Sequence, residues 1–491
     1  MPRKLLFLTL TVFIFSTSWC QTQLSFGPEF EDDKNGFSQY IVGSNNHFFF
    51  TSSTFGRSFT LRIYNQKTNA LVDEFSMKGS EEHVNVAVSL NKDFYFLIQE
   101  NENEFTIEKR NSANEAVAES TFSSKLGDDI VSFHSVIELE GKEALLFQRL
   151  SNSSKSYVYL EVSENTISNE FKPYIDFQSK EYTLSTFNGV PFKYAREKRG
   201  KKTLIRAAEI SEDLELKEER KVEIGSDYYL STSKNLFGEG LVIFGHKLNS
   251  KTKVAEYVLA IDGEITEFQV NFDEKMRLSS ENIFQFEKHF LVVGDYSKKG
   301  ENGIYALKLD YQGKILNKEI LKMYGKHTTR FPRKPSSIDF QISEIMFDDS
   351  TKTVVAVGGL LETFTNSKGS SIEYFSELNP IGIDESGKIK WKHTIEVIHR
   401  FGFRMPWLRR SALHDHHLYV VHSDGDGRNA YLEKISMEGK IVEKKEYRGK
   451  ESFTFVDVST ITQNGLFVMK CDFSDAPGFQ RNVRYANVKL W

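Results

Sequence analysis

Two stretches in the second half of the chain combine basic side chains with aromatic ones. They are Lys322 to Ser337 (KMYGKHTTRFPRKPSS) and Glu396 to Arg410 (EVIHRFGFRMPWLRR). Glu396 is the single carboxylate in both stretches, although the whole chain has a formal net charge of -5. Arginine guanidinium groups bind anionic groups through paired hydrogen bonds, and aromatic rings add flat contact area. This combination predicts a site for an anionic or glycan ligand, or for an acidic protein partner.

The candidate ligand-binding residues are the histidines, arginines and tryptophan of these two stretches. They are His327, Arg330, Arg333, His399, Arg400, Arg404, Trp407, Arg409 and Arg410. A second interpretation is that the aromatic rings hold long loops against the fold while the arginines are solvated.

Two short motifs contain residue types that ligate metals. The cluster His414-Asp-His-His417 could offer imidazoles that converge on one ion, but a polar turn between two strands has the same composition. The segment Ser423 to Asn429 resembles a calcium loop with oxygens at alternate positions, except that Arg428 occupies the next ligand position. We therefore expect no metal site and no cofactor.

Common catalytic motifs are missing from the chain. It has no G-x-S-x-G, H-E-x-x-H, P-loop or G-x-G-x-x-G motif. Cys471 follows an apolar run and is expected in the core rather than as a nucleophile. These observations favour a non-catalytic binding module over an enzyme. The alternative is a hydrolase or lyase acting on polysaccharide, with carboxylates or histidines brought into a central funnel from distant parts of the chain.

The elements that would position these residues form a repeat. The stretch Phe290 to Ile320 predicts three consecutive strands separated by polar turns. The same order of strands recurs, with equivalent third-strand positions about 47 to 70 residues apart, and each unit has a preceding strand candidate. The equivalent positions are Thr60, Ile107, Val158, Ile205, Tyr257, Tyr305, Phe375, Leu432 and Tyr485.

A period near 50 residues with four strands per unit is typical of a β-propeller. We therefore predict an all-β fold: a single propeller of four-stranded antiparallel blades. Nine repeats are counted, and eight blades result if the weak repeat Pro191 to Ser211 merges with a neighbour. The last repeat ends after its third strand, so Leu24 to Phe30 is predicted to supply its outer strand and close the ring.

Several repeats reverse direction at a short turn that ends in glycine, where a positive φ angle is often needed. The sequences IDESGKIKW (Ile383 to Trp391) and LDYQGKIL (Leu309 to Leu316) show it most clearly. They resemble the D-x-x-G-x-h-h-W/L repeats of secreted bacterial β-propeller proteins, where h is an apolar residue. The resemblance implies the propeller fold and implies no particular activity.

The N-terminus predicts export. Residues Met1 to Cys20 contain Arg3 and Lys4, an apolar run and small or polar residues, which is the pattern of a signal peptide. We expect cleavage before Gln21, a propeller domain over residues 21–491, and a periplasmic, cell-surface or extracellular protein. A lipoprotein anchored through Cys20 is the alternative. The later chain has no transmembrane segment, its mixed charges argue against nucleic acid as a partner, and a monomer is expected.

Overall fold

The computed structural model describes most of the chain and shows an all-β fold. The described residues are 25–26, 30–31, 40–55, 58–78, 83–101, 104–247, 252–298, 301–323, 336–365, 369, 371–401, 409–423, 429–448, 454–458, 466–472 and 482–490. Within these ranges every regular element is a β-strand. This described part contains no helix long and apolar enough to cross a membrane. The predicted signal peptide, residues 1–20, lies outside the described residues.

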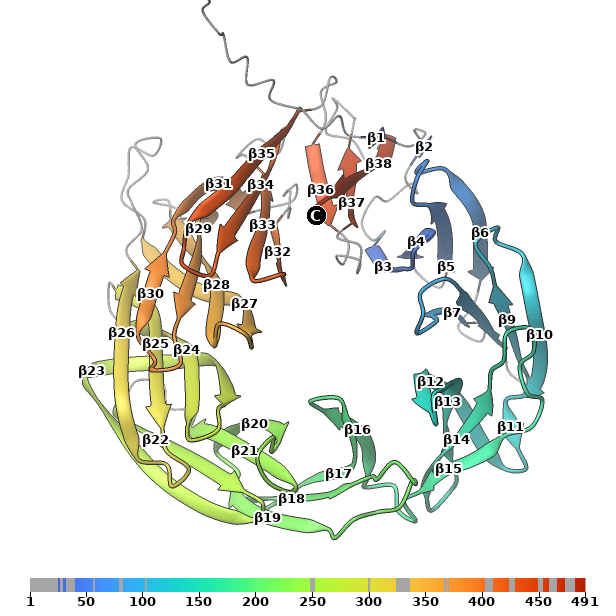
Figure 1. Cartoon of the computed structure of the whole chain (residues 1–491), viewed down its shortest axis with the longest axis horizontal. Coiled ribbons are helices and arrows are strands. Elements are labelled where there is room, and N and C mark those ends of the chain that lie inside the picture. Colours follow the sequence, from blue (N-terminus) through green and yellow to red (C-terminus); the bar gives the residue numbers. More distant parts are fainter. Residues whose placement is uncertain are drawn as a thin grey trace, which may run out of the picture.

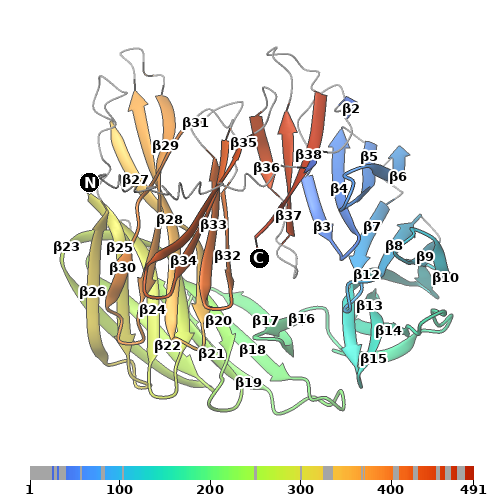
Figure 2. The same ribbon diagram turned by 45° about the horizontal axis from the view of Figure 1, so that its top comes forward.

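The strands form nine antiparallel units arranged in a ring, which makes the chain a β-propeller (Figure 1). Each unit places its first strand at the inner edge of the ring and its last strand at the outer edge. We number the units blade 1 to blade 9 along the chain. Figure 2 shows the blades side by side around the ring.

The first three blades come from the N-terminal third of the chain. Blade 1 contains β3 (Tyr40–Ser44), β4 (Phe48–Phe55), β5 (Ser58–Asn65) and β6 (Leu71–Lys78). Blade 2 contains β7 (His83–Val88), β8 (Tyr95–Glu100), β9 (Glu104–Arg110) and β10 (Ala116–Ser123). Blade 3 contains β11 (Lys125–Leu126), β12 (Asp129–Leu139), β13 (Lys142–Leu150), β14 (Lys155–Glu161) and β15 (Lys172–Asp176).

The next three blades include a strand that two blades share. Blade 4 contains β16 (Thr183–Phe187), β17 (Val190–Arg199), β18 (Lys202–Glu209) and β19 (Arg220–Gly225). Blade 5 contains β20 (Tyr228–Lys234), β21 (Leu241–Lys247), β22 (Thr252–Ile261) and the first part of β23 (Glu264–Gln285). Blade 6 contains the second part of β23, β24 (Phe290–Lys298), β25 (Glu301–Leu309) and β26 (Ile315–Met323).

The last three blades close the ring. Blade 7 contains β27 (Ser337–Asp348), β28 (Thr353–Thr365), β29 (Ser371–Ile383), β30 (Ile389–Lys392) and β31 (Ile395–Phe401). Blade 8 contains β32 (Arg409–His414), β33 (His417–Ser423), β34 (Asn429–Ser436) and β35 (Ile441–Arg448). Blade 9 contains β36 (Thr454–Val458), β37 (Leu466–Asp472) and β38 (Asn482–Lys489), with β1 (Ser25–Phe26) and β2 (Phe30–Glu31) added from the N-terminal end.

The predicted repeat matches this architecture. Eight of the nine positions taken as equivalent lie on the third strand of their own blade, and Val158 lies on β14, the third strand of blade 3 after the two-residue strand β11. The repeat Pro191 to Ser211, the weakest in sequence, contributes β17 and β18 to a separate four-stranded sheet, so the count is nine rather than eight. Blades 5 and 6 form one seven-stranded sheet because the 22-residue strand β23 serves both.

The N-terminal strand closes the last blade, as the sequence predicts. In β1, Phe26 pairs with Ala486 of β38, and in β2, Phe30 pairs with Val483 of the same strand. Both pairings are antiparallel. The closure removes the open sheet edge that a three-stranded last blade would leave.

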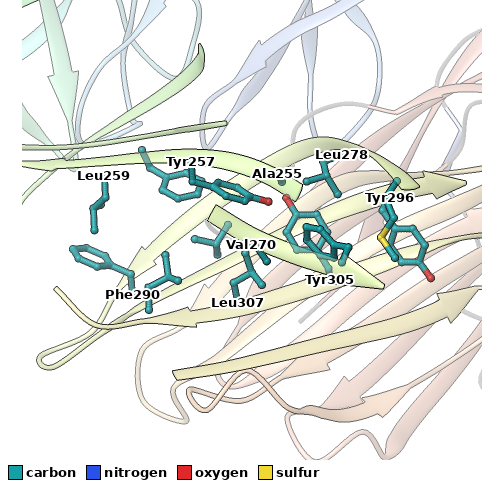
Figure 3. Close-up of a cluster of buried hydrophobic side chains, with 14 of the residues drawn as sticks. Ala255, Tyr257, Leu259, Val270, Leu278, Phe290, Tyr296, Tyr305 and Leu307 are labelled. Carbon is teal, nitrogen blue, oxygen red and sulfur yellow. The ribbon is translucent and has the colours of Figure 1, made fainter. Parts of the chain in front are cut away.

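The hydrophobic core lies between neighbouring blades. Apolar side chains of successive sheets interlock in separate clusters, of which the largest joins blades 5 and 6 (Figure 3). In that cluster Tyr257 of β22 and Tyr305 of β25 are both fully buried. Each small sheet therefore depends on its neighbours for burial, which is the reason such repeats occur in rings or arrays.

The turns between the third and fourth strands of blades 6 and 7 have the same local geometry. Asp310 accepts backbone hydrogen bonds from Gln312 and Lys314 through Oδ1, at 3.0 and 2.7 Å. Gly313, the last residue of that turn motif, has a φ of 76°. Gly387 occupies the same place after Asp384 and has a φ of 81°. The prediction that these glycines adopt positive φ is confirmed.

Candidate functional site

In blades 7 and 8, the described strand ends that border the connections between blades share one face of the ring with the strand ends that border the hairpins between second and third strands, and we call it the connection face. In blade 7, Ser337 at the start of β27 pairs with Thr363, close to the end of β28. Phe401 at the end of β31 pairs with Glu373, close to the start of β29. In blade 8, Arg409 at the start of β32 pairs with His422 near the end of β33.

The predicted ligand-binding residues divide into two groups. In the described strands, His399 and Arg400 pair with Phe375 and Tyr374 near the end of β31, and Arg409 and Arg410 begin β32. Five others lie outside the described residues: His327, Arg330, Arg333, Arg404 and Trp407. The predicted basic and aromatic site therefore stays a prediction. The described strand ends on both sides of the two stretches belong to blades 6, 7 and 8.

The first residue of the first basic stretch has a carboxylate partner. Lys322 Nζ lies 2.9 Å from Glu301 Oε2, and Lys298 Nζ lies 2.9 Å from Glu301 Oε1. Tyr296 donates a 3.0 Å hydrogen bond to the same carboxylate. Burial raises the pKa of Glu301, but these three donors outweigh burial, and the pKa of Glu301 falls below its ordinary value. Two lysines against one carboxylate leave this corner of blade 6 positive.

Polar contacts join blades 6, 7 and 8 near the connection face. Asp295 of β24 accepts a 3.0 Å hydrogen bond from the backbone nitrogen of Ile342 in β27. Glu344 of β27 accepts a 3.1 Å hydrogen bond from the backbone nitrogen of Ser411 in β32 and a second one from its hydroxyl. These contacts fix the inner strands beside the two basic stretches relative to one another.

A buried histidine and carboxylate lie beneath the start of β32. His422 is 5% exposed, and its ring stacks on Tyr431 with centroids 5.2 Å apart. His422 Nε2 lies 3.7 Å from Glu433 Oε1, which is too long for a hydrogen bond, so the contact is electrostatic. Lys444 donates a 2.6 Å hydrogen bond to Glu433. Burial raises the pKa of Glu433, but the neighbouring His422 and Lys444 outweigh it and lower this pKa to about 2.

A similar pair spans blades 5 and 6. His246 of β21 contacts Glu281 of β23, and both side chains are 3% exposed. Tyr257 donates a 3.3 Å hydrogen bond to Glu281, and burial raises the pKa of Glu281 above its ordinary value. In Figure 3 the hydroxyl of Tyr305 points toward that of Tyr257. The Tyr305 hydroxyl is buried without a hydrogen-bond partner among the described residues.

A β-bulge explains how Glu281 reaches the neighbouring blade. The register between β23 and β24 shifts between Ser279 and Asn282, which places one extra residue on the inner strand. Bulges turn side chains away from the regular alternation of a strand. The inner strands of blades 1, 3, 7 and 9 show comparable shifts. The bulge is therefore a repeated feature of the inner edge, and the apolar pattern of the sequence gave no sign of it.

The exposed side chains of the inner strands are mainly amides, hydroxyls and apolar groups. They include Asn85, Thr183, Thr186, Asn282, Gln341 and Ser343, together with Val42 and Ile130. The titratable or charged ones include His134 and Glu138 of β12, Arg277 of β23 and His414 of β32. Catalysis by general acid and base needs two titratable groups within reach of one substrate. The inner strands therefore carry titratable side chains as well as amides and hydroxyls.

The histidine cluster 414–417 forms a hairpin turn between β32 and β33. Asp415 and His416 have positive φ angles of 44° and 56°. His416 Nδ1 lies 3.0 Å from Asp348 Oδ1 and 2.7 Å from Ser350 Oγ, so its ring contacts blade 7. Throughout the described part of the chain, no group of three or more His, Cys, Asp or Glu side chains could hold a metal ion. Most of the calcium-like segment lies outside the described residues.

Sequence reasoning missed the buried polar groups that join the blades. One signal could have found some of them. His246, Asp295 and His422 each stand sixth in the second strand of a repeat, after an apolar run. A polar residue that returns at one position of an apolar strand indicates a buried hydrogen-bonding site. Glu281, which contacts His246, and Ile342, which donates to Asp295, come from neighbouring blades, and no sequence spacing predicts them.

Comparisons with known proteins give structural matches only. No protein-family model and no curated protein sequence matches the chain. Among solved structures, the chain is similar to the dihydro-heme d1 dehydrogenase NirN, at 10% identity over 86% of this chain and 75% of that one, with a TM-score of 0.34. It is also similar to the Dos1 propeller (9% identity, 94% and 95% coverage, TM-score 0.32). A third match is the polysaccharide lyase Uly1, at 8% identity over 82% of this chain and 90% of that one, with a TM-score of 0.34.

These values leave activity and ligand open, because propellers host many unrelated functions. The class of protein is defined by the chain's own architecture: a nine-bladed, all-β propeller closed by its N-terminal strand.

Proposed function

We propose that the protein is an exported binding module that holds an anionic ligand at the connection face of blades 6, 7 and 8. The ligand-binding side chains would come from the stretches Lys322 to Ser337 and Glu396 to Arg410. The ligand would be an anionic glycan or an acidic protein surface, because both present carboxylate or sulfate groups that arginine binds.

One observation carries this proposal. The described strand ends that border the two stretches occupy one end of three successive sheets: Met323 in blade 6, Ser337 and Phe401 in blade 7, and Arg409 in blade 8. Two basic segments that begin and end at the same face of adjacent blades can act on one extended anion. The polar contacts Asp295–Ile342 and Glu344–Ser411 hold these blades together and support a preorganised site.

The inner edge of the ring supports binding over catalysis. Its exposed side chains are chiefly amides and hydroxyls, which form hydrogen bonds without transferring protons at neutral pH. The proposal of export rests on the N-terminal sequence, Met1 to Cys20, and places the ligand in the periplasm, at the cell surface or outside the cell.

Binding to immobilised heparin, polygalacturonate and poly-glutamate tests the proposal. We expect the purified protein to bind at least one of these polyanions, and the binding to weaken when salt is raised from about 0.05 to 0.5 M, because salt screens exposed charges. Arg404→Ala and Trp407→Ala should each weaken it about tenfold, the loss expected for one important contact.

The matched control is Arg199→Ala. Arg199 is an exposed arginine at the hairpin between β17 and β18, on the same face but in blade 4. This variant should bind the polyanion as the wild type does. Absence of binding to all three polyanions, or an equal loss in Arg199→Ala and Arg404→Ala, contradicts the proposal.

A further inference from the structure

We infer that the protein has a second binding site, for a neutral saccharide, in a pocket between blades 2 and 3. The pocket has a volume of about 790 Å³. Ligand pockets range from about 300 to 1,000 Å³, so this one can accept a ligand of disaccharide size. Its walls come from the outermost strand β10 of blade 2 and from strands β11, β13 and β14 and the segment before β15 in blade 3. These strands are neighbours in Figure 1.

The apolar wall of the pocket is a rigid aromatic surface. Phe171 lines the pocket and packs against Phe122, with ring centroids 5.4 Å apart, and against Phe147, with centroids 5.2 Å apart. Phe122 and Phe147 are buried, whereas Phe171 is half-buried. A ring that is held on two sides and partly exposed on a third offers a flat surface to the C–H groups of a sugar ring.

The polar wall contains a guanidinium, a carboxylate, an amide and hydroxyls. Arg149 Nε donates a 2.7 Å hydrogen bond to Asp129, and the side chain of Arg149 is 39% exposed. This hydrogen bond orients the guanidinium beside the pocket. Glu170 and Asn169 also line the pocket and are exposed. Thr121 and Ser123 of β10 add their hydroxyls.

The mixture of charges selects a neutral ligand. Arg149 can only donate hydrogen bonds, ionised Glu170 can only accept them, and Asn169 does both. An anion would face the carboxylate of Glu170, and a cation would face the guanidinium of Arg149. The hydroxyls of a sugar each donate and accept, so one neutral saccharide can satisfy all three side chains. This charge balance separates the pocket from the basic stretches of blades 6 to 8.

Calorimetric titration of the purified protein tests this inference. The probes are the neutral disaccharides maltose, cellobiose, lactose and chitobiose, with the galacturonic acid dimer as an acidic comparator. We expect at least one neutral disaccharide to bind and the acidic dimer to bind more weakly. Asn169→Ala and Glu170→Gln should each weaken the neutral disaccharide about tenfold. Both positions are exposed, so the variants should keep the wild-type fold.

Two controls make the result specific. Glu140→Gln removes an exposed carboxylate from the other end of blade 3, at the hairpin between β12 and β13, and should leave saccharide binding unchanged. Arg404→Ala should also leave it unchanged, so that failure of this site and failure of the proposed polyanion site are distinguishable. The inference is overturned if no neutral disaccharide binds, if the acidic dimer binds more tightly, or if Asn169→Ala and Glu170→Gln bind like the wild type.

Discussion

Tyr485 of the last strand packs against Tyr64 of the first blade, with ring centroids 4.8 Å apart and an interplanar angle of 59°. Phe49 stacks on Tyr64 at 4.9 Å and contacts Tyr485 edge to face at 5.0 Å, so the three rings contact one another. Tyr485 is more than 400 positions from the other two residues in sequence, and all three side chains are fully buried. The cluster fills the space between blade 9 and blade 1, and so joins the last blade of the propeller to the first.

Loss of this cluster should open the ring. Tyr485→Ala should lower the free energy of unfolding by about 3 to 5 kcal/mol, the range for truncating a buried aromatic side chain. Tyr485→Phe keeps the aromatic side chain and should lower the free energy of unfolding much less. Urea denaturation followed by fluorescence measures both. A Tyr485→Ala variant as stable as Tyr485→Phe would show that closure does not depend on this contact.

The turn at Gly439 should be intolerant of a side chain for two separate reasons. Its φ of 77° costs an L-residue about 1 to 2 kcal/mol, and an added Cβ would overlap the side chain of Trp391. Gly263 has a φ of 98°, but an added Cβ there meets no atom within 4 Å. Gly439→Ala should therefore destabilise the fold by about 1 to 3 kcal/mol more than Gly263→Ala. Equal losses in urea denaturation would argue against the Trp391 contact.

Trp391 itself should link blade 7 to blade 8. Its indole nitrogen donates a 2.8 Å hydrogen bond to the carbonyl of Met437, and the side chain is buried. Trp391→Phe keeps much of the apolar contact but leaves that carbonyl without this donor, so we expect a loss of about 1 to 3 kcal/mol in unfolding free energy. The larger cavity of Trp391→Ala should cost more, about 3 to 5 kcal/mol. Thermal unfolding that ranks the two variants in the opposite order would contradict this account.

The buried Glu281 predicts one direction of pH dependence. Burial raises its pKa in the folded state. A raised pKa means that the group's contribution to stability is complete below the ordinary pKa of glutamate and is lost as pH rises through the folded-state value. The stability of Glu281→Gln relative to the wild type should therefore increase between about pH 4 and pH 8.

Glu433 predicts the opposite direction. Its pKa is lowered to about 2, so its contribution to stability is present above the ordinary pKa of glutamate and is lost as pH falls toward 2. Glu433→Gln should be less stable than the wild type at neutral pH, and the difference should shrink on acidification. Lys444→Met removes the ammonium group that donates the 2.6 Å hydrogen bond to Glu433. In that background, the stability difference at neutral pH between the chain with Glu433 and its Glu433→Gln variant should be smaller. A constant difference between wild type and Glu433→Gln across this pH range would refute the assignment.

The pairs His246–Glu281 and His422–Glu433 show that the same position in a blade does not fix the direction in which the carboxylate pKa shifts. His246 and His422 occupy the same place in the second strands of blades 5 and 8. The carboxylate partner of His422 comes from its own blade and receives a lysine, which favours the ionised form. The partner of His246 comes from the next blade and contacts a tyrosine in a fully buried place, which favours the neutral form.

The sequence by itself determined the nine units, their strand order, the closing strand and the glycine turns. These features depend on local patterns: alternation of apolar and polar residues along a strand, and a glycine where the backbone needs positive φ. Even the weak repeat Pro191 to Ser211 kept enough of this pattern to form its own blade.

Only the tertiary structure decided which distant residues meet. The contacts His246–Glu281, Glu344–Ser411 and Tyr64–Tyr485, and the pocket beside Phe171, each form between blades. Such contacts depend on the angle and spacing at which sheets pack and on bulges that redirect single side chains. A pattern along one strand records which of its faces is buried, but it does not record the neighbouring sheet that covers that face.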